Sequence, residues 1–168
     1  ADWILAPDGN PANRPHIVNN SWGDDEHSTF YQPSVQAWRA AGIFPVFSAG
    51  NDGTPTTCSE IGSPADYPES FTVASHDSTG TIASNSSKGP VFFGGDLNYK
   101  PNITAPGVGV VSSFPPDGWR TWSGTSMAAP HISGAVALLW SCNDYLKGNI
   151  SLTAALLQGG AASSPEGT

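Results

Sequence analysis

The sequence predicts an α/β fold in which a parallel sheet is flanked by helices, and three observations support that class. Two short apolar runs, at 16–20 and 43–49, have the length and composition of buried parallel strands. The segment between them has apolar residues near helical spacing, which predicts a strand, helix, strand unit. A longer apolar run from Met127 to Trp140 predicts a helix that protein encloses on nearly every face.

The first half of the chain is built around that strand, helix, strand unit. Its predicted elements are a surface loop or helix remnant at 1–14, a strand at 16–20, a helix at 30–41 and a strand at 43–49. Gly42 supplies the stop for the helix. In parallel sheets, functional residues gather beyond the carboxyl ends of the strands. Trp22 and Asn51 both follow a predicted strand and are therefore expected at that edge.

The second half alternates short β-type segments with loops and ends in helices. Its predicted elements are an irregular loop at 54–68, a strand at 71–75, a short strand or hairpin limb at 91–93, β-type segments at 103–114 and 119–123, and a final helix capped near Asn149 and ended by Gly159 and Gly160. Within the irregular loop, Ser63-Pro64 and Tyr67-Pro68 are the two candidates for a cis peptide bond.

Composition narrows the class of protein. The 168 residues suit one domain or part of one, with 38% hydrophobic residues, only 12% charged residues, 19 Gly and 15 Pro. This balance is typical of a compact, loop-rich, secreted protein. The formal net charge of −8 argues against nucleic-acid and anionic-membrane partners, and no apolar run reaches membrane-spanning length.

Ser126 is the candidate nucleophile because it stands between a Gly-containing turn and the long apolar helix. At a helix start, free backbone N–H groups and the positive end of the helix dipole can stabilise an oxyanion. Pro130 is expected in the first helical turn, where its missing N–H costs nothing. The competing interpretation is that Ser126 is only a helix cap. An α/β-hydrolase turn is a weaker rival, since Ala128 replaces the Gly that it needs.

The octet Gly124-Thr125-Ser126-Met127-Ala128-Ala129-Pro130-His131 resembles the nucleophile signature of the subtilisin-like serine peptidases, the subtilases. Four other stretches extend the resemblance over most of 16–142: NNSWG at 19–23, AGIFPVFSAGNDG at 41–53, GSPADYPESFTVAS at 62–75 and ITAPG at 103–107. The amino-acid sequences of these stretches are most similar to those of the bacillopeptidase F-like branch. The resemblance implies a partial subtilisin-like, doubly wound parallel sheet.

The same resemblance assigns roles to individual residues. It implies that Ser126 attacks the peptide carbonyl and that the Asn51 amide donates to the resulting oxyanion, although Gly-Asn-Asp-Gly alone is a typical turn. It places Ser21, Trp22 and Gly23 on one wall of a peptide cleft, Ser48, Ala49 and Gly50 on the other, and Gly62 near the floor of the pocket for the residue before the scissile bond. It also expects Pro64 to be cis. Core packing is the alternative role of Trp22.

A serine peptidase of this kind needs a His and an Asp ahead of its Ser, and the expected motifs are absent from these residues. The Asp77-Ser78-Thr79-Gly80 run lies after Asn51, which is the wrong place. Among the histidines, His16 is expected to be packed or solvated, and His27 and His76 are expected to be solvated. His131 lies on the same predicted helix as Ser126 but too far around it to direct its ring to the Ser126 hydroxyl. We therefore expect 1–168 to be the carboxyl-terminal portion of one catalytic domain, inactive alone, that self-associates or binds its amino-terminal portion.

The remaining expectations concern alternatives, cofactors and location. An inactive fragment or interaction module is the second functional hypothesis. The resemblance permits calcium, but no ligands are assigned, and Asp66, Glu69, Asp77 and Asp96 are interpreted as solvated. Cys58 and Cys142 are either buried thiols or a disulfide. The expected substrate is a polypeptide, and the expected location is extracellular.

Overall fold

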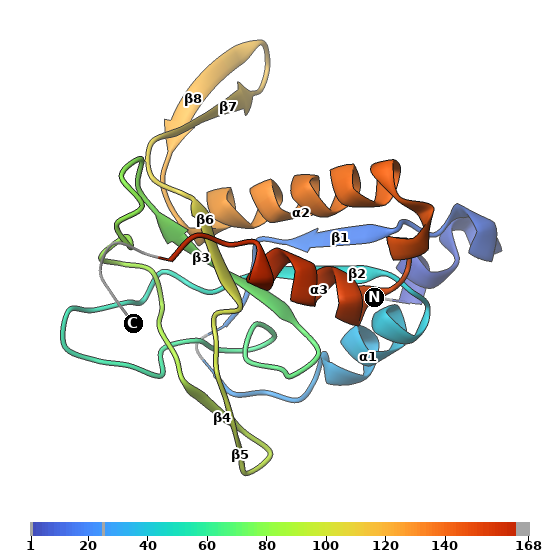
Figure 1. The fold of residues 1–168 in the computed structure, drawn as a ribbon, viewed down its shortest axis with the longest axis horizontal. Helices are drawn as coiled ribbons and strands as arrows, with labels where there is room; N and C mark the ends of the chain where they lie inside the picture. The colour runs from blue at the N-terminus through green and yellow to red at the C-terminus, as the bar shows by residue number, and fades with distance from the viewer. Residues whose placement is uncertain (1, 25, 164–168) are drawn as a thin grey trace.

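The fold is centred on a four-stranded parallel sheet. The computed structural model describes residues 2–24 and 26–163, and the sheet has the order β1-β2-β3-β6 (Figure 1). Its strands are β1 (Ile17–Asn20), β2 (Phe44–Ser48), β3 (Phe71–His76) and β6 (Ile103–Pro106). All three neighbouring pairs are parallel, with Ile17 opposite Phe44 and Val73 opposite Ile103. The predicted strands at 16–20, 43–49 and 71–75 are thereby confirmed.

Helices cover both faces of this sheet. On one face, α2 (Thr125–Cys142), the 3-10 turn η4 (Asp144–Leu146) and α3 (Ile150–Gly159) enclose a core that includes Phe44, Val46 and Val73. On the other face, α1 (Gln32–Ala40) packs against the alternate side chains, among them Phe47. Side chains alternate between the two faces along a strand, so β2 is buried throughout. The predicted α/β class with a parallel sheet flanked by helices is confirmed.

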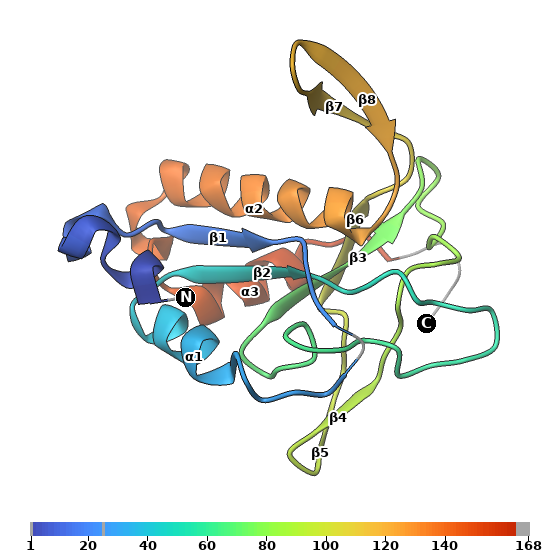
Figure 2. The ribbon, with the colours of Figure 1, turned by 180° about the vertical axis from the view of Figure 1, so that it is seen from behind.

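The remaining elements lie outside this layered core. Three 3-10 turns precede β1: η1 (Asp2–Leu5), η2 (Pro7–Gly9) and η3 (Pro11–Asn13). Two antiparallel hairpins follow β3, one made by β4 (Val91–Phe93) and β5 (Asp96–Asn98), the other by β7 (Val110–Phe114) and β8 (Gly118–Trp122). The β7–β8 hairpin projects from the rest of the chain in both views (Figures 1 and 2) and exposes 76% of Trp119.

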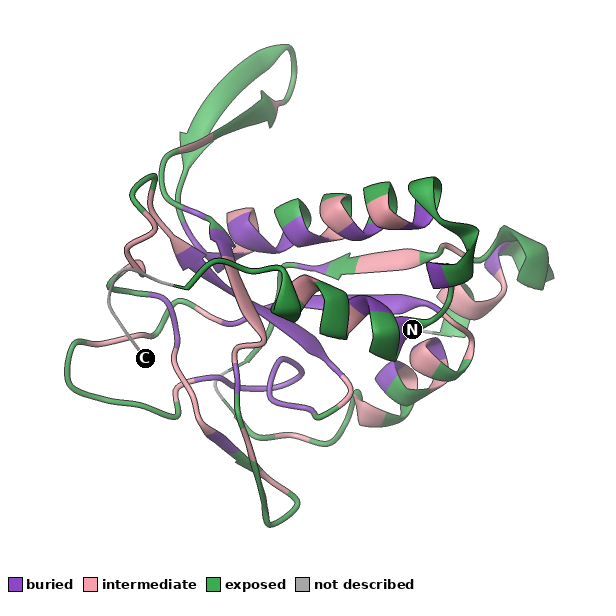
Figure 3. Cartoon of the chain, in the orientation of Figure 1, coloured by how far each residue is buried: buried purple, intermediate pink, exposed green. Residues whose placement is uncertain are grey.

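Helix α2 differs from its prediction in two ways. It is not enclosed on every face: Ala128, Ile132 and Val136 face the core, but the outer side is exposed (Figure 3), including 70% of Leu138. Pro130 does not lie in the first turn, because the helix begins at Thr125. A proline at this depth deprives the Ser126 carbonyl of its helical N–H partner.

Three smaller expectations can also be compared with the structure. Cys58 and Cys142 are both free and both exposed, so neither the buried thiols nor the disulfide is found. The Ser63–Pro64 bond is cis, as the resemblance implied, and Tyr67–Pro68 is not among the cis bonds of the described residues. Within those residues, no helix has both the length and the apolarity to cross a membrane.

Candidate active site

Ser126 lies half-buried in the first turn of α2, two residues after Gly124, a glycine that leaves room for a neighbouring side chain. Gly124 is the N-cap residue and has φ +145°, a conformation that favours glycine. A Cβ atom on Gly124 would lie 3.2 Å from Oδ1 of Asn51. The glycine before the Thr-Ser pair therefore lets the Asn51 side chain approach the start of the helix.

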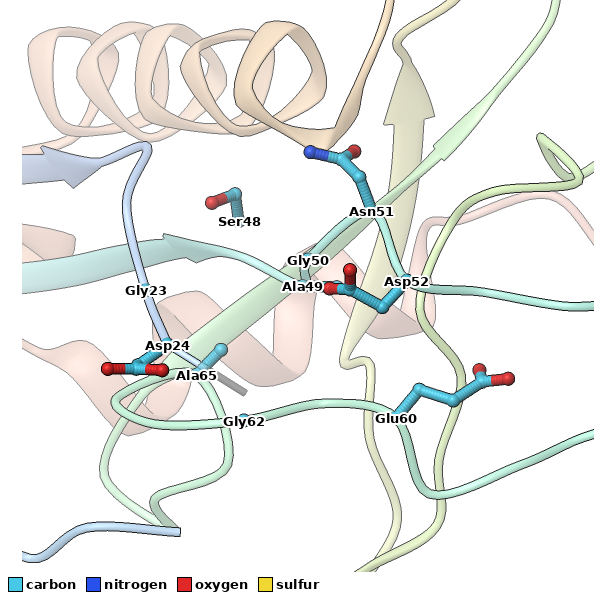
Figure 4. Close-up of a pocket in the computed structure, with 10 residues that line it drawn as sticks. All are labelled: Gly23, Asp24, Ser48, Ala49, Gly50, Asn51, Asp52, Glu60, Gly62 and Ala65. Carbon is cyan, nitrogen blue, oxygen red and sulfur yellow. The ribbon is translucent and has the colours of Figure 1, made fainter. Parts of the chain in front are cut away.

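Asn51 reaches that helix start from the loop after β2. Its Oδ1 accepts hydrogen bonds from the backbone N–H of Thr125 at 2.9 Å and from the Thr125 hydroxyl at 3.2 Å. Figure 4 shows the side chain directed toward the beginning of α2. Its Nδ2 group donates no hydrogen bond within the described part of the chain, so the amide offers a fixed, unused donor beside Ser126.

Thr125 joins the two segments that carry these residues. Its buried hydroxyl accepts the backbone N–H of Gly50 at 3.2 Å. Because Asn51 and Gly50 both bond to Thr125, the end of β2 is held against the start of α2. Gly107, which ends the ITAPG stretch, supports the same junction: the backbone N–H of Gly124 donates to its carbonyl at 2.7 Å.

Ser21 contacts Ser126 from the loop after β1. The Ser21 hydroxyl donates to the Ser126 backbone carbonyl at 2.9 Å, and the Ser126 hydroxyl donates to the Ser21 carbonyl at 3.5 Å. The first of these bonds satisfies the carbonyl that Pro130 leaves without a helical donor. The loop at the carboxyl end of β1 is therefore attached to the backbone of Ser126, the candidate nucleophile.

A pocket of about 190 Å³ opens next to Asn51. It is lined by Gly23, Asp24, Ser48, Ala49, Gly50, Asn51, Asp52, Glu60, Gly62 and Ala65 (Figure 4). Five of the seven predicted cleft residues are in this lining, together with Asn51. Ser126 borders a separate, more open hollow that it shares with Val110, Met127 and His131. The two candidate catalytic residues thus meet at Thr125, between these hollows.

Two predicted cleft residues lie outside the pocket lining. Ser21 instead contacts Ser126, as described above. The Trp22 ring packs edge to face against Tyr31 and Phe47, with centroids 5.0 and 6.0 Å away, so it has the packing role that was its alternative. Sequence reasoning missed four lining residues, Asp24, Asp52, Glu60 and Ala65. Two of them, Asp24 and Asp52, immediately follow the predicted site residues Gly23 and Asn51.

The histidines are engaged away from the Ser126 hydroxyl. Nδ1 of His131 lies 2.9 Å from the Met127 carbonyl, and Nδ1 of His76 lies 2.7 Å from the Asp77 carbonyl. His16 packs against Trp140. Across residues 2–24 and 26–163, no histidine forms a hydrogen bond with Ser126.

The remaining histidine, His27, has a side chain that is 51% exposed, in keeping with the expected solvated position. Its Nδ1 also lies 2.8 Å from Oδ2 of Asp66. Asp66 was also interpreted as solvated, yet it is fully buried, and its Oδ1 has no partner in the described structure. Ser63 adds a hydrogen bond to Asp66 Oδ2 at 3.2 Å. The isolated position of Asp66 in the sequence gave no signal of this cluster, which fixes the loop that carries the pocket floor.

Metal ligands are a separate question, because the resemblance permits calcium. In the two described ranges, no three or more His, Cys, Asp or Glu side chains gather closely enough to hold a metal ion. Glu60, a carboxylate in the pocket lining, accepts hydrogen bonds from Thr54, Thr57 and the backbone N–H of Lys88.

Comparison with known proteins places this geometry in context. The sequence pattern of the subtilase family matches residues 2–160. Bacillopeptidase F of Bacillus subtilis is 44% identical over 154 residues, covering 86% of this chain and 10% of that protein. Subtilisin E of the same species is 34% identical over 130 residues, covering 77% of this chain and 32% of the relative. The solved structure of sphericase superimposes with a TM-score of 0.73 at 30% identity, covering 86% of this chain and 48% of that one. The chain thus spans less than half the length of each of these relatives.

Proposed function

Because this chain belongs to the subtilase family, we propose that it is the carboxyl-terminal portion of a serine endopeptidase domain that hydrolyses peptide bonds through an acyl intermediate on Ser126. The observation that carries the proposal is the Asn51 amide, held by Thr125 at the start of the helix that bears Ser126. A nucleophile and an oxyanion donor from segments 75 residues apart in sequence meet at one helix end.

The proposed chemistry follows from this arrangement. Attack by the Ser126 hydroxyl turns the peptide carbonyl oxygen into an oxyanion, and the Asn51 Nδ2 group and the amino-terminal end of α2 stabilise that charge. The loss of one such donor raises the barrier by about 2.7–4 kcal/mol, a magnitude that comes from a subtilisin rather than from this chain. The tetrahedral intermediate then expels the amine, and water releases the acyl group.

The general base and its orienting acid would come from a partner, namely the amino-terminal portion of the same domain. The exposed outer face of α2, with Pro130, His131, Gly134 and Leu138, offers a surface for it. Strand β1 pairs only with β2, so its other edge is open to a further strand in the described sheet. Without that partner we expect this chain to be inactive and to self-associate through the same surfaces.

The substrate would be an extended polypeptide. Small residues at 48–50 and at Gly23 leave backbone groups accessible, and a peptide in extended conformation pairs with such edges through main-chain hydrogen bonds. Subtilisin relatives and a loop-rich, weakly charged composition favour an extracellular location.

The second candidate function is an inactive module, which is favoured by one observation: no histidine of the described residues forms a hydrogen bond with Ser126. A fluorophosphonate probe separates the two functions. With the amino-terminal portion present, the peptidase proposal expects labelling that Ser126→Ala abolishes and Ser141→Ala, on the exposed side of the same helix, leaves intact. Absence of labelling in a folded complex would favour the inactive module.

A further inference from the structure

The loop that carries Asn51 lies against a second segment of the chain, residues 85–87, which lies between β3 and β4. Gly53 donates its backbone N–H to the Asn85 carbonyl at 3.0 Å. A Cβ atom on Gly53 would lie 2.1 Å from the Ser86 carbonyl oxygen, so glycine is needed for this approach. The two segments are therefore in direct backbone contact beside the candidate oxyanion donor.

Ser87 forms a hydrogen bond on each side of Asn51. Its backbone N–H donates to the Gly50 carbonyl at 3.1 Å, and its hydroxyl oxygen accepts the backbone N–H of Asp52 at 3.0 Å. Gly50 and Asp52 are the residues immediately before and after Asn51. Ser87 thus holds the main chain on both sides of the residue whose amide would stabilise the oxyanion.

The Ser87 hydroxyl is closely packed against this loop. Ser87 is only 1% exposed. Gly50 has φ +105°, and a Cβ atom there would lie 2.7 Å from the Ser87 Oγ, so the glycine leaves room for the hydroxyl. Loss of the hydroxyl would therefore leave the Asp52 N–H without its acceptor.

The segment that bears Ser87 is itself attached to the parallel sheet. The backbone N–H of Ser75, a buried residue of β3, donates to the Ser86 hydroxyl at 3.1 Å. The Ala83 N–H donates to the Ser75 carbonyl at 2.9 Å, and the Ser86 N–H donates to the Ala83 carbonyl at 2.8 Å. The sheet thus sets the position of Ser87, and Ser87 sets the position of the loop.

The Asn51 side chain needs both of its ends fixed if its amide is to point in one direction. Thr125 holds the outer end, through Oδ1, and Figure 4 shows the side chain reaching from the loop toward α2. The bonds to Ser87 hold the main chain from which the side chain starts. An oxyanion donor is effective because it is held in place before the charge develops. A displacement of about 1 Å can cost about 10²-fold in rate.

We propose that Ser87 is a positioning residue for the Asn51 amide in peptide-bond hydrolysis. The inference rests on the proposed function, in which Asn51 donates to the oxyanion. Within the described part of the chain Ser87 forms no hydrogen bond with Ser126. It acts through the main chain of Gly50 and Asp52.

The main test is Ser87→Ala in the intact polypeptide that contains this chain and its amino-terminal portion. The substitution removes the acceptor of the Asp52 N–H and keeps the backbone bond to Gly50. We expect kcat for peptide hydrolysis to fall about 10- to 100-fold. KM should stay unchanged, because an oxyanion donor acts only in the transition state.

Ser86→Ala is the matched control. Both hydroxyls are buried, and each accepts one backbone N–H, so both substitutions should lower the urea midpoint by a similar shift. In Ser86→Ala the backbone bonds of Ala83 and Ser86 still hold the segment to β3, so kcat should not change. An equal loss of kcat in both variants would show that general destabilisation is the cause, and it would overturn the inference.

A double-mutant cycle tests whether Ser87 acts through Asn51. In Asn51→Ala no amide is left to position, so adding Ser87→Ala should change kcat by less than about twofold. If Ser87→Ala lowered kcat by the same factor in both backgrounds, its effect would not pass through Asn51 and the inference would be wrong.

A second readout requires no turnover. The Thr125 backbone N–H donates to Asn51 Oδ1, so its hydrogen exchange reports how firmly Asn51 is held. We expect exchange to be about two- to tenfold faster in Ser87→Ala, as for the loss of one hydrogen bond, and unchanged in Ser86→Ala.

The two proposals fail separately in these experiments. If the wild type never hydrolyses peptides and Ser126 is never labelled, yet Thr125 exchange responds to Ser87→Ala alone, the peptidase proposal fails while Ser87 still fixes Asn51. If the wild type is active and Ser87→Ala changes neither kcat nor Thr125 exchange, the positioning inference fails alone.

Discussion

The Asn51 side chain caps helix α2 by accepting the backbone N–H of Thr125 at 2.9 Å. The N-cap residue itself is Gly124, which has no side chain to do so. The cap thus comes from another part of the chain, and it holds the amide with its NH₂ group unused. A single residue therefore supports the helix with its oxygen and would serve the reaction with its nitrogen.

Substitution at Asn51 should separate these two contributions. Asn51→Asp keeps an acceptor at the helix start, where negative charge is favourable, whereas Asn51→Ala removes it. We expect Asn51→Ala to lower the free energy of unfolding by about 1 kcal/mol and Asn51→Asp to lower it less. Both should reduce kcat about 10²–10³-fold in the complete enzyme. Denaturant melts and peptide hydrolysis measure the two effects; equal stability of both variants would show that the cap is dispensable.

Ser21 and Pro130 should be energetically coupled through the Ser126 carbonyl. Ser21→Ala removes the donor to that carbonyl, at a cost of about 0.5–1.5 kcal/mol in unfolding free energy. Pro130→Ala restores a helical N–H for the same carbonyl, so the cost of Ser21→Ala should shrink in that background. A double-mutant cycle by urea denaturation measures the coupling. Additive effects would mean that the Ser21 bond does not replace the missing helical one.

Gly107 and Gly134 form a matched pair with opposite expected effects. A Cβ at Gly107 would lie 2.4 Å from Ser75 Cβ and 2.8 Å from the Gly124 carbonyl oxygen, so Gly107→Ala should destabilise the chain by about 1–3 kcal/mol. Gly134 lies within α2 with nothing within 4 Å of its Cβ position, so Gly134→Ala should stabilise it by about 0.5–1 kcal/mol. Thermal melts test both; a neutral Gly107→Ala would refute the close approach of β6 to α2.

Lys100 should make stability depend on pH. Burial, with a smaller contribution from Arg39, lowers the pKa of Lys100 to about 7, while its unfolded value is 10.5. Between these values the unfolded chain holds the proton that the folded chain has released. The free energy of unfolding should therefore rise with pH, by up to about 1.4 kcal/mol per unit.

Urea melts from pH 6.5 to 10 measure that slope, with Lys100→Met as the variant that removes it. The Lys100 Nζ also donates to the Ser70 carbonyl, to Thr72 Oγ1 at 3.2 Å and to Asn102 Oδ1 at 2.9 Å, and these acceptors favour the charged form. A profile as flat as that of Lys100→Met would show that the acceptors outweigh burial.

The exposed face of α2 should make the isolated chain associate. Leu138 is 70% exposed there, and apolar side chains exposed on a helix favour contact with another apolar surface. Analytical ultracentrifugation should detect dimers or larger species, and Leu138→Ser should reduce them, whereas Leu152→Ser on α3, 45% exposed, should have a smaller effect. A monodisperse monomer with a sharp two-state melt would contradict the proposed need for a partner.

Local pattern was enough to predict the sheet and the helix of Ser126, because each buried strand is a short apolar run and each ends in a small-residue loop. The resemblance to the subtilases, rather than local pattern, predicted most of the pocket lining, through the motifs at 19–23, 48–51 and 62. What local pattern missed depends on tertiary contacts. The capping of α2 by Asn51 and the burial of Asp66 beside His27 join residues far apart in sequence, and nothing in the local pattern marks them.

The exposed side of α2 was missed for a different reason. Apolar residues at nearly every position of a helix predict burial on every side, but this chain supplies neighbours for only one side. Pro130 was expected in the first helical turn because the predicted helix began later than α2 does. Its position further inside the helix is tolerated because Ser21 donates to the Ser126 carbonyl, a contact that no helical pattern can reveal.

The pocket beside Asn51 is made from residues 23–65, while the attacking hydroxyl comes from a helix that begins at Thr125. The proposed substrate pocket and the proposed nucleophile thus belong to separate stretches of polypeptide, which Thr125 joins by hydrogen bonds. Under the proposed function, we expect libraries that vary residues 52–60 to change which peptides are cleaved while Ser126 stays unchanged.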